Sequence, residues 1–273
     1  TAKLYVGTYG GGLNILDFNT NTFSSVKEIK ANIIRCMHKD NNGIIWIGTY
    51  GNGLIRYNPK KHTSKQVLKN VTDDVWNIIS GNENEIWLGT WGSGLIKLNT
   101  LNLEHKQYKK DNSINSIGDD IVLSIAKNKD GNIWIGTYGS GLNYLNTNTN
   151  QFKHFGSSGV NNKETNNKKI RNILINKDGN LLLGTDGGGL NIYNSKKNEF
   201  EYVTKENGLP NNVVYGIAQE NENIWITTNY GIAKYSLTKK TITNFDYDDG
   251  LQNNEFNQGA LYFNSDKIYA GGI

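Results

Sequence analysis

The sequence predicts an all-β fold, a seven-bladed β-propeller of four-stranded antiparallel blades. Three observations lead to this prediction: a hairpin motif that recurs along the 273-residue chain, glycine-rich turns, and no helical hydrophobic period over any useful length. The clearest copy of the motif lies at residues 132–146, where the strand Ile133–Thr137 leads through a turn at 138–141 into a strand at 142–145. Glycines in the turn supply the backbone freedom that a tight hairpin needs.

The same hairpin recurs at a spacing that defines the blades. Its anchor glycine falls at positions 7, 48, 89, 136, 184, 227 and 271, with Thr227 as the one exception, so the repeat is 41 to 48 residues long. A repeat of this length holds four short strands, and such units stack as propeller blades because a lone small sheet cannot bury both faces. We therefore expect one propeller domain over residues 1–273, with blades at 1–25, 26–68, 69–111, 112–159, 160–207, 208–250 and 251–273.

Each complete unit predicts an apolar inner strand, the two strands of the hairpin and a polar outer strand. In the second unit these strands are residues 32–39, 44–49, 54–58 and 64–68. The next four units place their inner strands at 74–79, 120–127, 169–175 and 212–219, and their outer strands at 105–109, 151–155, 200–203 and 241–247. The first unit lacks its inner strand and the last supplies only 255–263 and 267–271, so both blades are expected to be incomplete.

Composition excludes several classes of protein. The net charge of +4 is spread over scattered lysines, and three arginines, Arg35, Arg56 and Arg171, are too few for a groove that follows a phosphate backbone, so no nucleic-acid partner is expected. One cysteine, Cys36, excludes a disulfide framework and a cysteine-based zinc site, and we expect it to pack in the core. No apolar run approaches the ~20 residues that span a membrane and no signal peptide is visible. The chain starts without Met inside one repeat, as expected of a piece of a longer protein.

The repeat resembles that of the two-component regulator propeller family. The resemblance rests on Asp-Ile-Val-Leu-Ser-Ile at residues 120–125 followed by Lys-Asp-Gly-Asn-Ile-Trp-Ile-Gly-Thr at 129–137. Residues 208–214 look like a blade opening of that family, and residues 253–257 with 268–272 look like its last blade before an immunoglobulin-like module. The departures are Leu182, Asp186 and a shortened turn at 228–230.

This resemblance implies a role on the extracytoplasmic side, periplasmic or cell-surface, of a bacterial membrane sensor. Such propellers sense ligands, often glycans, and their output is a histidine kinase or a cyclic-dinucleotide enzyme. The resemblance also implies that the propeller itself is not inserted in the membrane but is tethered through a downstream spanning helix. These are expectations that come from the family alone.

Catalytic and metal-binding patterns are not evident. Of the four histidines, His38 is expected in a turn between the first two strands, His62 in a loop, and His105 and His154 on outer strands, and none pairs at triad or metal spacing. The turns at residues 128–131 and 176–179 invite a calcium interpretation, but they lack oxygen ligands at alternate positions and are better read as hairpin turns. No cofactor, no metal and no enzymatic activity are therefore expected.

Acidic and aromatic residues are expected to share one face of the propeller. Chain direction alternates through four strands, so loops from an outer strand to the next inner strand lie on the same face as the hairpin turns. These loops carry the acid pairs 73–74, 119–120 and 248–249, and the turns carry Tyr9, Tyr50, Trp91 and Tyr138. Carboxylates beside aromatic rings suit hydroxyl-rich ligands such as sugars. Aromatic residues that recur at one repeat position can instead seal contacts between blades.

A second candidate set lies on the inner strands, two residues before the apolar anchor of each. Positions that differ between blades can form a specific site, and this position holds Arg35, Trp76, Leu123, Arg171, Tyr215 and Gln258. Arginine here could bind a sulfate or carboxylate on a sugar, and it could instead pair with acids of neighbouring blades. The predicted ligand-binding residues are Arg35, Trp76, Arg171, Tyr215, Asp74, Asp120, Trp91 and Tyr138.

The favoured hypothesis is a non-catalytic propeller that binds a small polar ligand, such as an oligosaccharide, on this face. Replacing Arg35 and Arg171 together by alanine should then abolish binding with little change in melting temperature. The alternatives are a scaffold for protein–protein contact, including a homodimer, and a lyase or hydrolase with a propeller fold.

Overall fold

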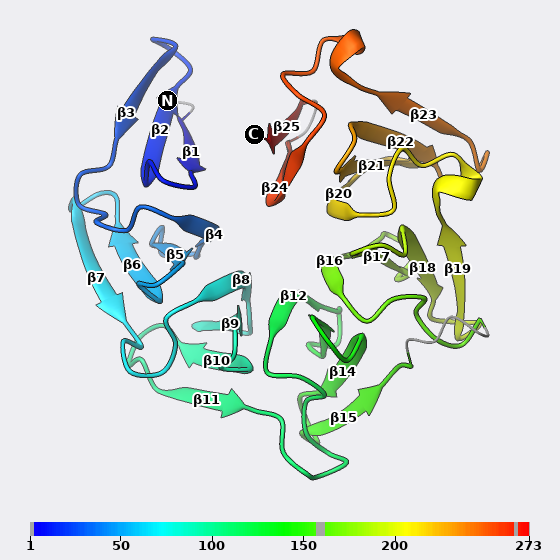
Figure 1. The fold of residues 1–273 in the computed structure, drawn as a ribbon. Helices are drawn as coiled ribbons and strands as arrows, with labels where there is room; N and C mark the ends of the chain where they lie inside the picture. The colour runs from blue at the N-terminus through cyan, green and yellow to red at the C-terminus, as the bar shows by residue number, and fades with distance from the viewer. Residues whose placement is uncertain (1–2, 157–161, 265–266, 273) are drawn as a thin grey trace. The chain divides into compact units, whose positions relative to one another are not determined.

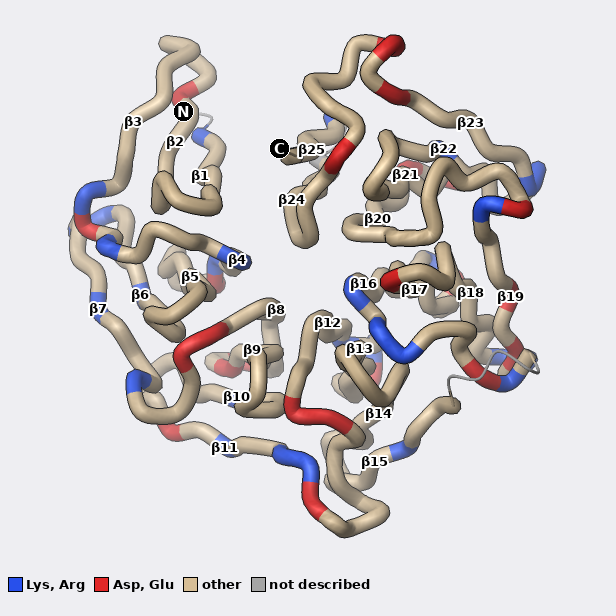
Figure 2. The backbone as a smooth tube through the Cα atoms, viewed as in Figure 1, with Lys and Arg blue, Asp and Glu red and all other residues tan. Residues whose placement is uncertain are grey.

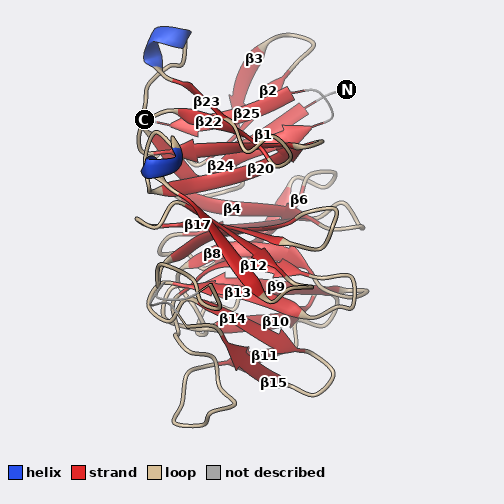
Figure 3. Ribbon diagram, turned by 90° about the vertical axis from the view of Figure 1, so that its right-hand side faces the viewer, coloured by secondary structure: helices blue, strands red, loops and turns tan. Residues whose placement is uncertain are grey.

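The chain folds as an all-β β-propeller with four-stranded antiparallel blades, in a computed structural model that describes residues 3–156, 162–264 and 267–272. Its contacts divide it into two parts, one formed by residues 1–111 and 120–122 and the other by residues 112–119 and 123–273. Figure 1 shows the strand labels used below, and Figure 3 shows that strands dominate the described residues.

The first part contains three sheets in which each strand pairs with the next one in the chain. One is three-stranded and two are four-stranded. Their strands are β1 (Lys3–Gly7), β2 (Leu13–Asp17) and β3 (Thr22–Ser25), then β4 (Ile34–Lys39), β5 (Ile45–Thr49), β6 (Leu54–Asn58) and β7 (Thr63–Val67), then β8 (Val75–Ser80), β9 (Glu85–Thr90), β10 (Leu95–Asn99) and β11 (His105–Tyr108).

The second part contains three four-stranded sheets and one two-stranded sheet. Two short 3-10 helices, η1 (Lys205–Asn207) and η2 (Tyr247–Asp249), follow outer strands (Figure 3). The strands are β12 (Val122–Lys127), β13 (Ile133–Thr137), β14 (Leu142–Asn146) and β15 (Gln151–His154), then β16 (Ile170–Ile175), β17 (Leu181–Thr185), β18 (Leu190–Asn194) and β19 (Glu199–Val203), then β20 (Val214–Glu220), β21 (Asn223–Thr228), β22 (Ile232–Ser236) and β23 (Ile242–Phe245), and finally β24 (Phe256–Asn264) and β25 (Lys267–Gly272).

The predicted number of blades was wrong. The described residues form six blades of three or four strands rather than seven, because the last repeat contributes only the hairpin β24–β25, and two strands do not make a blade. The prediction that the first unit lacks its inner strand is confirmed by the three-stranded sheet β1–β2–β3.

The anchor glycine of the motif is required by the next blade. A Cβ atom at Gly48 in β5 would lie 2.7 Å from the carbonyl oxygen of Val75, in the inner strand β8 of the following sheet, and 2.4 Å from the Cys36 sulfur. Atoms cannot approach this closely, so only glycine lets the two sheets come together here. The same position in the sixth repeat holds Thr227, and there the paired residue Gly216 makes the room, because its own Cβ would lie 2.7 Å from the Thr227 hydroxyl.

The rest of the motif closes the turn and joins successive blades. The Thr49 hydroxyl donates a hydrogen bond of 2.8 Å to the Gly53 carbonyl, across the turn between β5 and β6. The Gly53 amide, held at a φ of +62°, donates a bond of 2.7 Å to the Asp73 carbonyl, in the loop that leads into the next blade. Such bonds confirm that hairpin turns and outer-to-inner loops lie on one face, which we call the turn face.

The core of each part lies between successive sheets. In the first part, Trp46, Leu54, Ile78 and Leu88 belong to one buried cluster shared by β4–β7 and β8–β11. In the second part, a cluster between β16–β19 and β20–β23 follows the same plan. Inner and hairpin strands are therefore apolar, while outer strands such as β3 and β11 carry mainly exposed side chains, as predicted.

Within the described ranges, no helix is both long and apolar enough to cross a membrane.

Candidate functional site

The inner-strand residues singled out in the sequence lie at one structural feature, an irregularity in strand register at the start of the inner strand. Arg35 lies at the register shift between Ile34 and Cys36 in β4. The equivalent shifts hold Trp76 in β8, Arg171 in β16 and Tyr215 in β20. An extra residue of this kind is left out of the hydrogen-bonded ladder and its side chain is re-aimed. In each part, the starts of two inner strands therefore carry residues that differ between repeats.

In the first part, Arg35 is surrounded by aromatic rings. Its guanidinium carbon lies 4.3 Å from the ring centroid of Trp76, 5.3 Å from that of Tyr50 and 5.4 Å from that of Tyr9. Trp76 in turn stacks on Trp91, with 5.1 Å between ring centroids and 29° between planes. We call these five residues the Arg35 cluster. They come from three successive sheets, through two inner strands and three hairpin turns.

The rim of the Arg35 cluster is open to solvent. Tyr9 is 73% exposed, Tyr50 50% and Trp91 40%, whereas Arg35 and Trp76 are half-buried. Large aromatic side chains gathered at this level of exposure are unusual on a protein surface and mark contact sites.

The Arg35 guanidinium has no ion-pair partner among the described residues. Its Nε is buried without a hydrogen-bond partner, and so is the Nε1 of Trp76. Its terminal nitrogens, Nη1 and Nη2, are not among the buried unpartnered atoms and make no hydrogen bond to the described part of the chain. Unpartnered N–H donors at a half-buried position are typical of sites completed by water or by a bound group.

In the second part, Arg171 holds the same place in β16, but both of its terminal nitrogens have side-chain partners. Its Nη2 lies 2.8 Å from Oδ2 of Asp186, and its Nη1 donates to Oε1 of Gln258 at 2.8 Å. Gln258 returns a bond of 3.1 Å from Nε2 to the Arg171 carbonyl, so the two residues clasp β24 to β16. Arg171 also lies over the ring of Tyr215, 5.2 Å from its centroid. The arginine is therefore an element of structure within its own part.

A second cation shares the Asp186 carboxylate. Lys169 Nζ lies 3.6 Å from Oδ2 of Asp186 and 4.5 Å from the ring centroid of Tyr138. The hydrogen bond with Tyr138 and the charge of Asp186 raise the pKa of Lys169. Burial raises the pKa of Tyr215, against the opposing effect of the Arg171 charge. Figure 2 shows the basic stretch at the start of β16 beside the acidic position at the end of β17.

The two predicted carboxylates are engaged by backbone amides of the loops. Oδ1 of Asp74 accepts a bond of 2.7 Å from the Gly51 amide, and Oδ1 of Asp120 accepts one of 2.7 Å from the Lys110 amide. Asp74 belongs to the loop beside the Arg35 cluster, but its carboxylate is not an ion-pair partner of Arg35. Both residues therefore organise the turn face through its loops.

The predicted set thus separates into groups. The structure brings Arg35, Trp76 and Trp91 together in the first part, and it brings Arg171 and Tyr215 together in the second. Tyr138 is linked to the second group through Lys169 and Asp186.

Two aromatic residues of the Arg35 cluster are missing from the predicted site. Tyr9 and Tyr50 were recognised as turn aromatics but omitted from it, although they occupy the same repeat position as Trp91. Asp186 was noted only as a departure from the repeat, and the signal that could have found its role is its exchange for an aromatic in the repeat that carries Arg171.

The remaining polar candidates are structural. His38 lies within β4 rather than in a turn, its Nε2 is 3.2 Å from the Ser80 hydroxyl, and burial lowers its pKa. In the two turns considered for calcium, Oδ1 of Asn128 and Oδ1 of Asn176 each accept two backbone amides, which makes them hairpin turns. In the described residues no group of three or more His, Cys, Asp or Glu is arranged to hold a metal.

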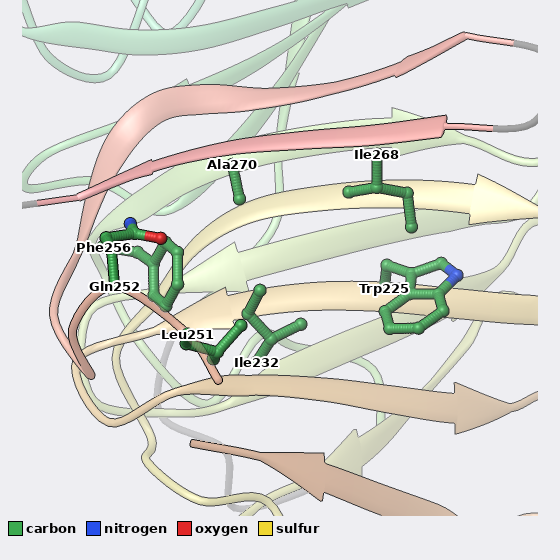
Figure 4. A pocket seen from close by; sticks show the side chains of 7 residues that line it. All are labelled: Trp225, Ile232, Leu251, Gln252, Phe256, Ile268 and Ala270. Atoms are coloured by element: carbon green, nitrogen blue, oxygen red, sulfur yellow. The ribbon is translucent and has the colours of Figure 1, made fainter. Parts of the chain in front are cut away.

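An apolar pocket of about 270 Å³ lies in the second part, between the hairpin strands β21–β22 and the two-stranded sheet β24–β25 (Figure 4). Trp225, Leu251, Phe256 and Ile268 line it, with Gln252 as the one polar side chain among its seven lining residues. It lies where a sheet of only two strands covers its neighbour incompletely.

Comparison with known proteins identifies the repeat. Residues 28–51, 111–139 and 208–230 match a family described as two component regulator propeller. These three segments are therefore similar to the repeat of the two-component regulator propeller family. Each matched segment includes the inner strand and the first hairpin strand of its repeat, the second, fourth or sixth, and ends in the hairpin turn.

Similar proteins match this chain over only part of their own length. Over 70 residues the chain is 40% identical to the protein named histidine kinase P4 of Formosa agariphila, a match that covers 25% of this chain and 5% of the kinase. A crystal structure of the extracellular domain of a protein described as a hybrid two-component system, from B. thetaiotaomicron, is 27% identical with a TM-score of 0.86. That match covers 100% of this chain and 36% of the solved one.

A second extracellular domain from B. thetaiotaomicron, described as that of a one-component system, shares the fold at 18% identity. Its TM-score is 0.73, and the match covers 98% of this chain and 36% of the solved one. The chain is thus a propeller domain of the kind found in two-component and hybrid sensor systems, and it spans about a third of the length of these extracellular domains.

Proposed function

We propose that the chain is the non-catalytic, ligand-sensing propeller of a bacterial sensor, and that the Arg35 cluster recognises a glycan or a similar small polar ligand. The observation that supports this most is the gathering of exposed Tyr9, Tyr50 and Trp91 around an arginine without an ion-pair partner among the described residues.

The chemistry of the cluster favours binding of sugars. The C–H face of a pyranose stacks on an aromatic ring, and tyrosine hydroxyls and guanidinium N–H groups form hydrogen bonds with ring hydroxyls. The cluster contains no histidine, aspartate or glutamate, the side chains that most often transfer protons in catalysis. A site built from them holds a ligand and leaves its bonds intact.

The comparisons support an extracytoplasmic location and a kinase output for the whole protein. The similar solved structures are described as extracellular domains, and the relative with the matching 70 residues is named a histidine kinase. We propose that this propeller lies on the periplasmic or cell-surface side, is tethered through a spanning helix, and passes its signal to a kinase or cyclic-dinucleotide output.

Isothermal titration of the 273-residue chain with hits from a glycan thermal-shift screen tests the proposal. Trp91→Ala and Tyr50→Ala should each weaken binding by about tenfold, since loss of one stacking ring removes roughly 1 kcal/mol or more. Tyr230→Ala is the matched control, because Tyr230 is a similarly exposed tyrosine (54%) in the hairpin turn of the sixth repeat and should bind as wild type.

Two outcomes would contradict the proposal. If no glycan binds, and the chain instead forms a dimer or captures a protein through the turn face, the exposed aromatics serve a scaffold. If a bound glycan is converted to product, the propeller is an enzyme, which product analysis of each hit would reveal.

A further inference from the structure

We infer that the ligand of the Arg35 cluster is a carbohydrate with an anionic group next to a sugar ring, either the carboxylate of a uronic acid or a sulfate ester. The inference rests on the proposed function and specifies which of its ligands the site selects.

The charge of Arg35 is the first step of the argument. A half-buried guanidinium loses part of its hydration, and proteins normally compensate for this loss with an anion. Arg171, at the same place in its own repeat, has Asp186 at 2.8 Å. Arg35 lies over three aromatic rings, and among the described residues it has no ion-pair partner and no hydrogen bond from Nη1 or Nη2. The compensating anion is therefore supplied by the ligand.

The shape of the guanidinium supports an oxyanion with two oxygens to offer. Two terminal nitrogens of arginine form parallel hydrogen bonds to a carboxylate or a sulfate, and these charge-assisted bonds are stronger than those to a neutral hydroxyl. The Arg35 guanidinium carbon lies 4.3 Å from the Trp76 ring centroid, and Nη1 and Nη2, which make no hydrogen bond to a described residue, remain to donate such bonds.

The position of the aromatic rings fixes where the sugar lies. Trp91, which is 40% exposed, stacks on Trp76, so the pair forms a platform directly beside the cation. An anion held by Arg35 would place the attached ring over this platform or against the exposed rings of Tyr9 and Tyr50. A ligand with an apolar ring face and an adjacent negative charge satisfies both halves of the cluster at once.

The nearest predicted carboxylate does not compete for Arg35. Asp74 lies two residues before Trp76, but its Oδ1 accepts the Gly51 amide at 2.7 Å and no ion pair with Arg35 is formed. The Asp74 carboxylate is thus held by a backbone amide of the turn.

The test is isothermal titration of the 273-residue chain with matched disaccharides, namely neutral galactobiose, digalacturonate and sulfated galactobiose. Other disaccharides are tested in the same way, each as a neutral, a carboxylated and a sulfated form. One anionic form should bind at least about tenfold more tightly than its neutral counterpart. That preference should shrink severalfold between 50 and 500 mM NaCl, because salt screens the contact. The carboxylate and sulfate arms identify the source of the anion.

Variants at Arg35 separate this inference from the proposed function. Arg35→Gln should remove the preference while neutral disaccharides still bind, and Arg35→Lys should restore part of it. Arg56→Gln is the control, since Arg56 is in β6, in the same part but outside the cluster, and it should retain the full preference.

If neutral disaccharides bind as tightly as anionic ones and Arg35→Gln changes nothing, the inference is overturned while the proposed function stands. If no disaccharide in any arm binds, both are overturned.

Discussion

Arg35 in the first part and Arg171 in the second occupy the same position of the repeat, yet their surroundings are opposite. Each lies at the register shift of an inner strand, and each has a buried Nε without a partner. The terminal nitrogens of Arg171 donate hydrogen bonds to Asp186 and Gln258. Arg35 instead lies over three aromatic rings and has no carboxylate partner among the described residues.

The difference traces to one residue in the hairpin turn. The residue after the motif threonine is Tyr50 in the repeat of Arg35 and Asp186 in the repeat of Arg171. An aspartate there neutralises the arginine and turns it into a clasp, and a tyrosine leaves its charge available. A repeat scaffold can therefore hold, at one position, an arginine with a carboxylate partner and an arginine without one among the described residues, depending on a neighbour in the turn.

The largest effect that this comparison predicts is on stability. Asp186→Ala should lower the free energy of unfolding by about 2 kcal/mol, because it leaves the Arg171 charge, only 20% exposed, without its anion. Urea denaturation gives this value directly, and the melting temperature should fall by about 5 °C.

The matched variant in the first part is Arg35→Met, which breaks no ion pair and keeps an apolar stem against the rings. Its cost should stay near 1 kcal/mol, the loss of exposed cation–π contacts. Equal losses in the two variants would mean that the two arginines play the same structural role. This pair also revises the expectation that an Arg35 and Arg171 double alanine variant would change the melting temperature only a little.

The second prediction exchanges the turn residues. Tyr50→Asp should supply Arg35 with the carboxylate that Arg171 has, and it should weaken binding of an anionic disaccharide by more than about tenfold, through both the lost ring and the added negative charge. Titration of the folded variant measures this.

The converse variant, Asp186→Tyr, should build an aromatic contact beside Arg171 and make the second part bind the same anion weakly. Far-UV circular dichroism of each variant controls for folding. Unaltered anion affinity in a folded Tyr50→Asp protein would show that the ligand does not meet Arg35.

Much of the architecture was predictable because the same hairpin motif occurs many times along the chain. Gly48 and its equivalents were recognised as the anchor of the repeated hairpin strand, and the structure shows that they pack against the next inner strand. The inner-strand residues that differ between repeats, Arg35, Trp76, Arg171 and Tyr215, were found by comparing the repeats with one another, and all four lie at register shifts.

Other features could not be predicted because they depend on contacts between distant residues. The sixth repeat has Thr227 at the position that Gly48 holds in the second repeat. In the sequence this is only a departure from the motif, but in the structure Gly216 of the paired strand compensates for it. Asp186 and Gln258 are 15 and 87 residues from Arg171, and no local pattern links them. The predicted number of blades was wrong because two strands are enough to show the hairpin motif in the sequence, and the seventh copy has only the two strands β24 and β25.

The smallest predicted effect concerns the residue that follows each arginine, Cys36 in β4 and Asn172 in β16. The Cys36 sulfur points inward, 3.7 Å from the Val75 carbonyl, and burial raises the pKa of its thiol from 9.0 to about 12. A raised pKa means that the unfolded chain loses this proton first as the pH rises. Stability should therefore fall above neutral pH, by about 0.4 kcal/mol between pH 7 and 9 from this group.

Urea denaturation of wild type and Cys36→Ala, in reducing buffer at both pH values, isolates the effect. The alanine variant is less stable at either pH, because it loses packing beside Gly48, but its drop between pH 7 and 9 should be smaller than that of wild type by this amount. The lysines and tyrosines that also titrate are common to both proteins and cancel in the difference. If the free energy of unfolding fell equally in both proteins, the Cys36 thiol would be in contact with water. The irregularity at Arg35 would then not direct Cys36 toward the core.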